Sequence, residues 1–497
     1  MIGTILHSVD VFTILTFFIT LLLAYIIWDN VVRVRTNIPG PTPWPIIGNM
    51  PSIIGTKNAS ETFLQMQKKY GDLVYLKLGI LPIVLVYGYK NVHQVLVDNG
   101  NKTKFRPRHI LHFLKTLFPG KTGLIHSNGQ EWVDIRRFTM VALKDFGVGK
   151  QSIEEKIQDE VGLLMKLFSK QGKKPTDCSK MFPKATSNII SSIIFGSRFD
   201  FDDPEFNNLL GNIATLFKYA AAFRLENCFP ILDKVNPFNK SKLAVEGRRE
   251  IQKYIATRIE SVRCSFDANN IRHFLDVYLE QEEKPDSKIS DESLFITIAD
   301  LYIAGTDTTS VTLQWSMLYM IKYPDVQKKC RNQILEVIGE DRQPVVKDKD
   351  NIPYVMATLQ EVQRISTIAP LSVPHVAIED VEIDGKIIPR DTIIIPHLMS
   401  VHLDPTVWDK PEEFRPERFL DKDGHFFKKE GFSAFSMGPR LCPGKQLAES
   451  ELLLFFVSII QRFNLTKGDD NDQLPMTGIQ TGTTNQPQPF KICFIPR

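Results

Sequence analysis

The chain of 497 residues is long enough for one large domain or several, and 43% hydrophobic with 24% charged residues is typical of a globular protein. A formal net charge of +3 is too small to favour nucleic acid as a partner. The six cysteines form no Cys-x-x-Cys pair and no zinc spacing, so we expect no disulfide framework and a reducing, cytoplasm-facing location. No repeat, Gly/Ser linker or low-complexity segment divides residues 46–497, which favours one large, mainly helical domain there.

Residues 1–28 have the features of a membrane anchor. The 18 residues from Val11 to Trp28 include no charged side chain, and this length can span a bilayer. No Lys or Arg precedes them, whereas Arg33 and Arg35 follow, so the positive-inside rule places the N-terminus in a lumen and the body in the cytoplasm. A cleaved secretory signal is the alternative, but the segment lacks a basic beginning and a small-residue cleavage site. We therefore expect an uncleaved N-terminal transmembrane helix.

A stiff connector and a small sheet are predicted next. Four prolines between Ile38 and Pro45 indicate a non-helical hinge over residues 29–45. An amphipathic helix is expected over 59–69, followed by two short strands at 72–79 and 82–87.

Trp132 and Arg136 are the first candidate binding residues. They stand four residues apart in a segment of helical pattern, so they share a face. An indole N–H beside a guanidinium suits a carboxylate ligand. The alternative is an aromatic anchor next to a surface arginine.

Residues 293–320 predict a long apolar helix that is interrupted at residues 304–310. Gly305 weakens a helix interior, and the hydroxyl groups that follow compete for backbone hydrogen bonds. We expect the Thr308 hydroxyl to donate to the Ala304 carbonyl and to open a groove. A buried carboxylate at Asp307 requires a compensating function. A core helix with satisfied threonines is the alternative.

Two further groups of polar residues lie between this helix and the C-terminus. Glu361 and Arg364 are three apart on one helix face, although exposed pairs of this kind are common and contribute little. His375 ends an extended segment limited by prolines, and a single histidine is more often structural than functional. Residues 381–389 predict a hairpin that turns at Asp384-Gly385.

Cys442 lies in a Gly- and Pro-rich loop directly before a predicted buried helix over 445–460. The unpaired N–H groups and the positive dipole end of a helix favour a thiolate there. Gly438 and Gly444 allow the backbone to wrap closely around the sulfur. Such a thiolate can be a nucleophile, a soft-metal ligand or an axial ligand of haem iron, and a buried structural cysteine is the alternative.

The spacing Phe-x-x-Gly-x-Arg-x-Cys-x-Gly over Phe435–Gly444 resembles the haem-binding signature of the cytochrome P-450 (haem-thiolate) family at every defining position. The resemblance covers residues 38–497, with the motifs in family order. The Pro-Leu-Ser-Val-Pro-His375 stretch and the anchor resemble the microsomal animal-type group of xenobiotic, fatty-acid and steroid hydroxylases. The resemblance implies the cytochrome P-450 fold, mainly α with small β-sheets, and haem b as the cofactor.

The resemblance also implies a role for each motif. Cys442 would be the axial ligand of the haem iron, and Phe435 would pack against the ligand loop that ends at Gly444. The partners implied for the haem propionates are Trp132, Arg136, His375 and Arg440. In the oxygen-activation helix, which includes Ala304 and Gly305, Thr308 would steady dioxygen while Asp307 relays protons. A buried structural network would join Glu361, Arg364 and Arg418.

The implied reaction inserts one atom of O2 into a hydrophobic small molecule and reduces the other atom to water. Electrons would come from NADPH through a membrane-bound flavoprotein reductase, at the endoplasmic reticulum membrane, with the single-pass protein facing the cytoplasm. Two alternatives stay open. One is a haem-thiolate isomerase or dehydratase that acts on a peroxide without reductase, against which Asp307 and Thr308 count. The other is a non-catalytic membrane-anchored haem protein, which reductase-dependent NADPH consumption would separate from an enzyme.

Overall fold

A computed structural model provides the structure of the chain. It describes residues 11–27, 36–53, 56, 58–106, 111, 115, 116, 120, 122–145, 151–219, 229, 241–282, 284, 289–468, 474–481 and 483–497. Trp28, Arg33, Arg35 and the first part of the predicted hinge lie outside the described residues.

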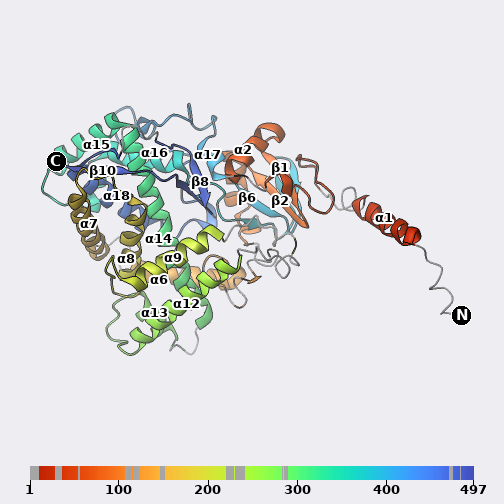
Figure 1. Cartoon of the computed structure of the whole chain (residues 1–497), viewed down its shortest axis with the longest axis horizontal. Helices are drawn as coiled ribbons and strands as arrows, with labels where there is room; N and C mark the ends of the chain where they lie inside the picture. The colour runs from red at the N-terminus through yellow and green to blue at the C-terminus, as the bar shows by residue number, and fades with distance from the viewer. Residues whose placement is uncertain are drawn as a thin grey trace.

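The described chain is mainly helical, as predicted (Figure 1). Its α-helices are α1 Val11–Ile27, α2 Ala59–Tyr70, α3 Tyr89–His93, α4 Gly100–Thr103, α6 Gly129–Asp145, α7 Gln151–Gln171, α8 Phe182–Ile194, α9 Pro204–Tyr219, α12 Ser241–Arg263, α13 Phe274–Glu282, α14 Asp291–Lys322, α15 Pro324–Val337, α16 Pro353–Ser366, α17 Leu398–His402 and α18 Lys445–Arg462. Short 3₁₀ turns are η2 Met50–Ser52, η5 Cys178–Lys180, η6 Val346–Asp350, η7 Pro416–Phe419 and η8 Gly438–Arg440, and η3 Gln94–Asp98 is a π-turn.

The β-structure is confined to small sheets, which confirms that prediction. The largest has the order β1-β2-β6-β3, with β1 Leu73–Leu78, β2 Leu81–Val86, β3 His375–Val376 and β6 Ile393–Pro396. Strands β1 and β2 pair antiparallel as a hairpin, whereas β2 and β6 pair parallel although they are far apart in the sequence. Two-stranded sheets are formed by β4 Val381–Ile383 with β5 Lys386–Ile388, β7 Phe463–Lys467 with β10 Ile492–Pro496, and β8 Gly478–Thr481 with β9 Thr484–Pro487.

The hairpin predicted around Asp384-Gly385 is confirmed. Strands β4 and β5 pair antiparallel with Ile383 opposite Lys386, so the two residues between them form the turn. Both have positive φ, 47° for Asp384 and 70° for Gly385, which is the conformation that a two-residue hairpin turn requires.

Helix α14 runs through the helical part of the molecule (Figure 1), and most of its length is buried. The predicted interruption at 304–310 is wrong, because α14 is continuous from Asp291 to Lys322. Its hydroxyl groups donate to carbonyls of the same helix, such as Thr306 to Tyr302 at 2.8 Å and Thr312 to Thr308 at 3.0 Å, and so do not displace the helical bonds. A Cβ on Gly305 would lie 3.3 Å from Ile190, so this glycine lets α8 pack closely against α14.

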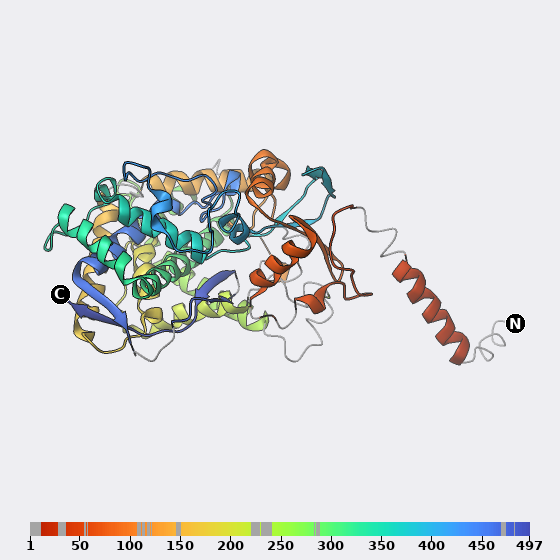
Figure 2. The same cartoon turned by 90° about the horizontal axis from the view of Figure 1, so that it is seen from above.

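Helix α1 lies apart from the rest of the protein in both views (Figures 1 and 2), and its large apolar side chains are exposed. It contains 17 residues without a charged side chain. Within the residues that the structure describes, no helix combines the length and the hydropathy needed to cross a bilayer.

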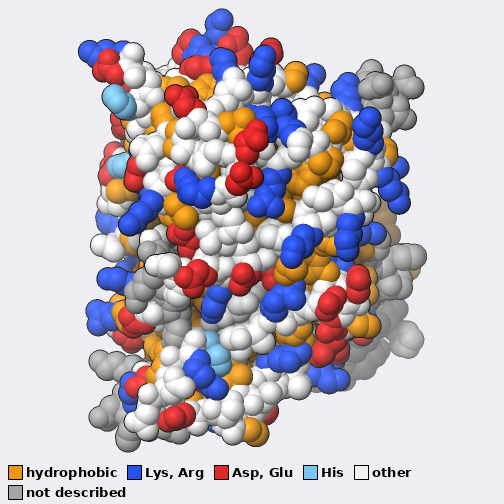
Figure 3. All heavy atoms as spheres, turned by 90° about the vertical axis from the view of Figure 1, so that its left-hand side faces the viewer, with side chains coloured by type: hydrophobic (Ala, Val, Ile, Leu, Met, Phe, Trp, Pro, Cys, Tyr) orange, Lys and Arg blue, Asp and Glu red, His pale blue; other side chains and the backbone are white. Residues whose placement is uncertain are grey.

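The surface at the far end from α1 carries charges of both signs. Figure 3 shows Lys and Arg side chains interspersed with Asp and Glu side chains over this face. This face therefore has no continuous basic surface, in agreement with the small net charge of +3.

Candidate active site

The loop before α18 is shaped by close backbone contacts. The Cys442 amide donates to the Phe435 carbonyl at 3.0 Å and closes the loop on itself. Gly438 has a φ of 72°, and a Cβ at this position would lie 1.9 Å from the carbonyl oxygen of Leu96 in η3. Only glycine fits such a contact, so the loop is docked tightly against the N-terminal part of the chain. Gly444 is the N-cap of α18.

Two opposing effects act on the Cys442 thiol. Burial raises its pKa, whereas the backbone amides of Gly444 and Lys445 and the charge of Arg136 lower it. The predicted effect of the helix N-terminus on the thiol pKa is therefore present. Without a cofactor, however, burial raises this pKa by more than the helix N-terminus lowers it. A thiolate at this position therefore needs a positive partner in addition to Arg136, such as a metal ion.

A buried cationic cluster lies beside the loop. The guanidinium of Arg440 stacks over the indole of Trp132, 4.0 Å from the ring centre, and that of Arg136 lies 5.6 Å from the same ring centre. Arg440 donates to the carbonyls of Lys104 at 2.8 Å and Ser127 at 2.7 Å.

Arg136 connects this cluster to the cysteine loop. Its Nη2 donates to the carbonyl of Leu441 at 2.7 Å, one residue before Cys442. Helix α6 thus presents Trp132 and Arg136 on one face, and the predicted spacing brings both to the loop.

Arg106 belongs to the same cluster, although the sequence did not single it out. Its Nη1 donates to Nε2 of His375 at 2.8 Å and to the carbonyl of Val373 at 3.0 Å. On the opposite side of the ring, Nδ1 of His375 donates to the carbonyl of Thr103 at 2.5 Å. Burial and Arg106 both lower the pKa of His375 well below its usual range, so the neutral imidazole accepts from Arg106.

None of the three arginines pairs with a carboxylate in the described part of the chain. Burial, followed by Arg106 and Arg136, lowers the pKa of Arg440 to about 8, and burial with Arg136 lowers that of Arg106 to about 9. Arg440 Nη1 and Trp132 Nε1 are buried donors without a partner among the described residues. Buried unpaired donors and cations are costly, so this cluster fits a ligand with carboxylates, such as haem with its two propionates.

Helix α14 provides a second set of polar groups. The Thr308 hydroxyl donates to the Ala304 carbonyl at 2.9 Å, which confirms that predicted contact. Burial raises the pKa of Asp307 to about 6, and the Thr484 hydroxyl, which donates to Oδ2 at 3.2 Å, lowers it. Asp307 therefore has a carboxyl group that can change protonation near neutral pH.

A buried contact joins α14 to α18, the helix that follows the cysteine loop. The Thr309 hydroxyl donates to the carboxyl group of Glu451, whose pKa burial raises to about 8. Neither side chain is more than 3% exposed. Because Glu451 lies on the helix that begins directly after Cys442, this contact holds the Thr308 segment against the cysteine side of the molecule.

Glu361, Arg364 and Arg418 form one buried network. Arg364 donates to both carboxylate oxygens of Glu361, at 2.7 and 2.8 Å, and Arg418 donates to Oε1 at 3.0 Å. The three side chains are at most 1% exposed. The remaining donors of Arg364 bond the carbonyls of His402 and Pro411, each at 2.7 Å, so the network holds the segment that leads to the cysteine loop.

His402 extends that network toward the loop. Its Nε2 accepts from the Ser433 amide at 3.0 Å, and its Nδ1 bonds the Thr367 hydroxyl at 2.8 Å. Burial, followed by the charge of Arg364, lowers the pKa of His402 to about 3, so the ring stays neutral and can accept. Ser433 stands two residues before Phe435, so this bond fixes the beginning of the loop.

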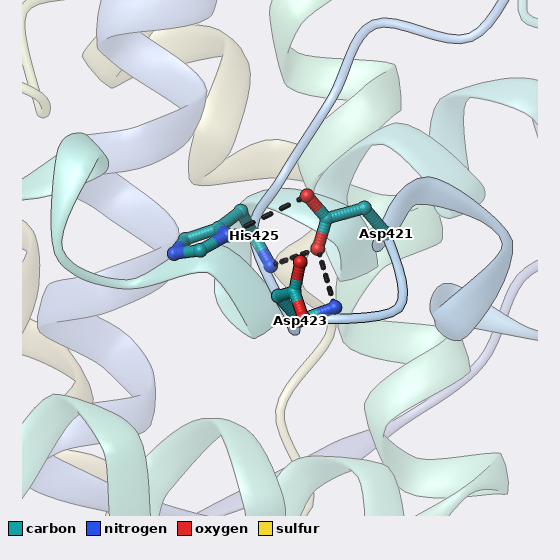
Figure 4. A group of neighbouring side chains, drawn as sticks. All are labelled: Asp421, Asp423 and His425. Carbon is teal, nitrogen blue, oxygen red and sulfur yellow. Dashed lines mark hydrogen bonds and ion pairs between the residues drawn. The ribbon is translucent and has the colours of Figure 1, made fainter.

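Asp421, Asp423 and His425 form a separate, exposed group (Figure 4). Oδ1 of Asp421 accepts from the amides of Asp423 at 2.9 Å and His425 at 2.8 Å. These bonds close a surface turn, and they account for the position of Asp421 without a ligand.

The structure thus brings together Trp132, Arg136, His375 and Arg440 beside Cys442, and it places Asp307 and Thr308 on the helix packed against α18. Sequence reasoning missed Arg106 and Glu451. Their partners are distant in the sequence, and neither belongs to a spaced pattern. The polar segment over residues 478–484 was expected to reach the active site, but no role was predicted for Thr484 itself. A buried acid at the seventh position of an apolar helix is the one feature by which Glu451 could have been noticed.

Helical architecture, a cysteine at the entrance of a buried helix and a buried cationic cluster beside it are the features expected of a haem-thiolate protein. The cytochrome P450 family model matches residues 38–494. The chain belongs to the cytochrome P450 family, and it is a monooxygenase that uses haem b, O2 and electrons from NADPH delivered through a reductase.

Similar proteins cover nearly the whole chain. Cytochrome P450 2H1 of Gallus gallus is 37% identical, over 95% of this chain and 96% of its own length. Cytochrome P450 2C8 of Homo sapiens is 36% identical, over 98% and 99%. Cytochrome P450 2B4 of Oryctolagus cuniculus is 36% identical, over 92% and 94%.

Proposed function

We propose that Cys442 is the axial ligand of the haem iron and that Arg106, Trp132, Arg136, His375 and Arg440 form the binding site for the propionates. The observation that carries this proposal is the buried set of unpaired donors and cations next to the cysteine loop. Arg136 serves both parts, because it donates to Leu441 and lies over Trp132. Phe435 and Gly444 shape the loop that presents the sulfur.

Haem with a thiolate ligand supplies the redox chemistry that cleaves O2. The overall reaction takes a substrate C–H group, O2, NADPH and a proton to an alcohol, water and NADP⁺. The protein must deliver protons to the place where O2 is reduced and keep bulk water out. Asp307 is the buried acid that can hold and release a proton, and Thr308 is the adjacent hydroxyl that can pass it on.

Ala304 and Gly305 would belong to the oxygen-activation segment of α14. The Thr308 hydroxyl is directed to the Ala304 carbonyl at 2.9 Å, and Gly305 allows α8 to approach the helix. Glu361, Arg364 and Arg418 would be structural, because their buried bonds hold the segment before the cysteine loop rather than a reacting group.

The first test is the carbon monoxide difference spectrum of the reduced protein beside a Cys442→Ala variant. A strongly red-shifted Soret band in the wild type that the variant lacks would support thiolate ligation. A wild-type band at the position of histidine-ligated haem would mean that Cys442 is not the ligand, and the assignment of the site would fail.

We further propose that residues 11–28 anchor the protein in the endoplasmic reticulum membrane, with the catalytic body facing the cytoplasm. The uncharged composition of α1 and its exposed apolar side chains support this. A hydrophobic substrate of the steroid, fatty-acid or xenobiotic class would suit an enzyme at a bilayer.

Membrane attachment can be tested by alkaline extraction of microsomes. The full chain should stay with the membrane pellet, and a variant without residues 1–28 should be released. Testosterone, lauric acid and 7-ethoxycoumarin, one probe of each class, should be offered with reductase and NADPH. Release of the full chain would contradict the anchor, and the absence of any product would contradict the substrate classes.

A further inference from the structure

The C-terminal hairpin reaches the acid of α14. Strands β8 and β9 pair antiparallel with Thr481 opposite Thr484, so Thr484 is the first residue of the returning strand. Its side chain is buried, with 2% of the residue exposed, and its hydroxyl donates to Oδ2 of Asp307 at 3.2 Å.

We propose that Thr484 is a positioning residue for the proton relay: its hydroxyl holds the carboxyl group of Asp307 in one orientation. The proposal rests on the proposed relay role of Asp307. The proton relay would then depend on a residue of the C-terminal hairpin as well as on Asp307 and Thr308 of α14.

The position of Thr484 is fixed by its neighbour in β9. The Asn485 amide donates to the Ile368 carbonyl at 2.8 Å, and its side-chain Nδ2 donates to the Ser366 carbonyl at 2.7 Å. Nε1 of Trp315 donates to the Asn485 carbonyl at 2.9 Å. These bonds attach β9 to the end of α16 and to α14 itself, so the Thr484 hydroxyl meets Asp307 without a further rearrangement.

The opposite strand supports the same arrangement. Gly478 faces the side chain of Asn485, and a Cβ on Gly478 would lie 1.9 Å from Oδ1 of Asn485. The hairpin therefore depends on glycine at this position to keep Asn485, and hence Thr484, against the helices.

A positioned donor matters because few groups act on this carboxyl. Burial and the Thr484 hydroxyl are the two causes of its pKa shift, which brings the pKa to about 6. On α18, Glu451 faces the neighbouring part of α14 through its hydrogen bond with Thr309. Without the Thr484 hydroxyl, the Asp307 carboxyl group would lose this donor and would be free to change its orientation.

The test compares Thr484→Val, which keeps the volume but removes the donor, with Thr484→Ser, which keeps the donor. Thr483→Val is the matched control, because Thr483 is the exposed neighbour in the same hairpin. Asp307→Asn identifies the signals that belong to Asp307.

The first readout needs no substrate. Infrared titration of the ferric protein should show a protonated carboxyl band that Asp307→Asn lacks. Thr484→Val should raise the apparent pKa of that band by about one unit. The hydrogen bond from Thr484 stabilises the ionised form of Asp307, and the variant lacks this bond. Thr484→Ser and Thr483→Val should leave the apparent pKa in place. An unchanged band and pKa in Thr484→Val would overturn the proposal.

The second readout is the coupling of NADPH to product with 7-ethoxycoumarin and reductase. Thr484→Val should release about threefold to tenfold more hydrogen peroxide per product, as expected for one misplaced hydrogen-bonding group. The spectral affinity for 7-ethoxycoumarin should stay unchanged, and Thr484→Ser should restore coupling.

The two proposals fail differently. If Asp307→Asn couples as well as the wild type, the proposed relay is wrong, and the role of Thr484 is lost with it. If Asp307→Asn uncouples while Thr484→Val does not, the relay stands and the inference about Thr484 alone is wrong.

Discussion

The guanidinium of Arg440 lies over the indole of Trp132, with 4.0 Å between its central carbon and the ring centre. The two residues come from the cysteine loop and from α6, so this contact joins the two parts of the candidate cofactor site. Each also has a buried donor without a partner among the described residues, Nη1 of Arg440 and Nε1 of Trp132. The pair therefore connects two elements of the site, and each of its members still has an N–H group that can donate to a ligand.

Replacing Trp132 by a residue without the indole N–H should weaken haem binding. Trp132→Phe keeps an aromatic face for Arg440 but loses the N–H, and the loss of one bond to a charged acceptor should reduce haem affinity roughly tenfold to a hundredfold. The rate of haem transfer to apomyoglobin measures this. Met140→Leu, on the exposed side of the same helix, is the control. Equal transfer rates in Trp132→Phe and wild type would show that Nε1 does not bind the cofactor.

The buried Glu361 network predicts a large loss of stability. Arg364→Ala leaves the carboxylate of Glu361 with one arginine partner and leaves the carbonyls of His402 and Pro411 without their donor. Breaking a buried ion pair in this way costs about 3–5 kcal/mol. Denaturant unfolding measures the change.

The matched control is Arg415→Ala. Arg415 pairs with Asp409 at 2.9 Å, but Asp409 is 72% exposed, and an exposed pair contributes about 1 kcal/mol or less. Similar losses in the two variants would mean that burial does not decide the strength of the network.

Gly438 predicts a steric effect on the cysteine loop. In Gly438→Ala the new Cβ would lie 1.9 Å from the Leu96 carbonyl, so the loop must move and Cys442 with it. We expect the carbon monoxide complex of this variant to lose most of its thiolate-type band. Gly424→Ala is the control, since Gly424 has a φ of 84° but nothing within 4 Å of its added Cβ. Gly424→Ala should lower the stability only by the backbone strain, about 1 kcal/mol, and should keep the thiolate-type band.

The sequence alone predicted the parts of the site that depend on local spacing. Arg440 and Cys442 share one loop, and Trp132 and Arg136 share one helix face, so their patterns were visible without the fold. Arg106 was not, because its partners Val373 and His375 are brought to it by β3 and the long connection before it.

The main error in the fold concerned α14. Gly305 and the hydroxyl groups after it suggested an interruption, since such residues are weak helix formers. The structure removes the conflict in two ways. Hydroxyls donate back to carbonyls of the helix, as Thr308 does to Ala304, and α8 occupies the space that the glycine leaves. Tertiary packing of this kind has no local sequence pattern.

The burial of Glu451 leads us to expect that the stability of the protein depends on pH. In the folded protein burial raises its pKa from 4.5 to about 8, so the folded state binds this proton more tightly than the unfolded state does. The stabilisation is fully present below about pH 4.5 and is lost as the pH rises through about 8. Glu451→Gln cannot ionise, but its amide oxygen can still accept from Thr309.

The wild type should therefore lose stability relative to Glu451→Gln between pH 5 and 8, by at most about 1.4 kcal/mol per pH unit. Denaturant unfolding at pH 5, 6.5 and 8 measures the difference. Glu449→Gln, on the partly exposed side of α18, should follow the wild type at each pH. A constant difference between wild type and Glu451→Gln would show that Glu451 does not ionise on unfolding, and its burial beside Thr309 would then need another explanation.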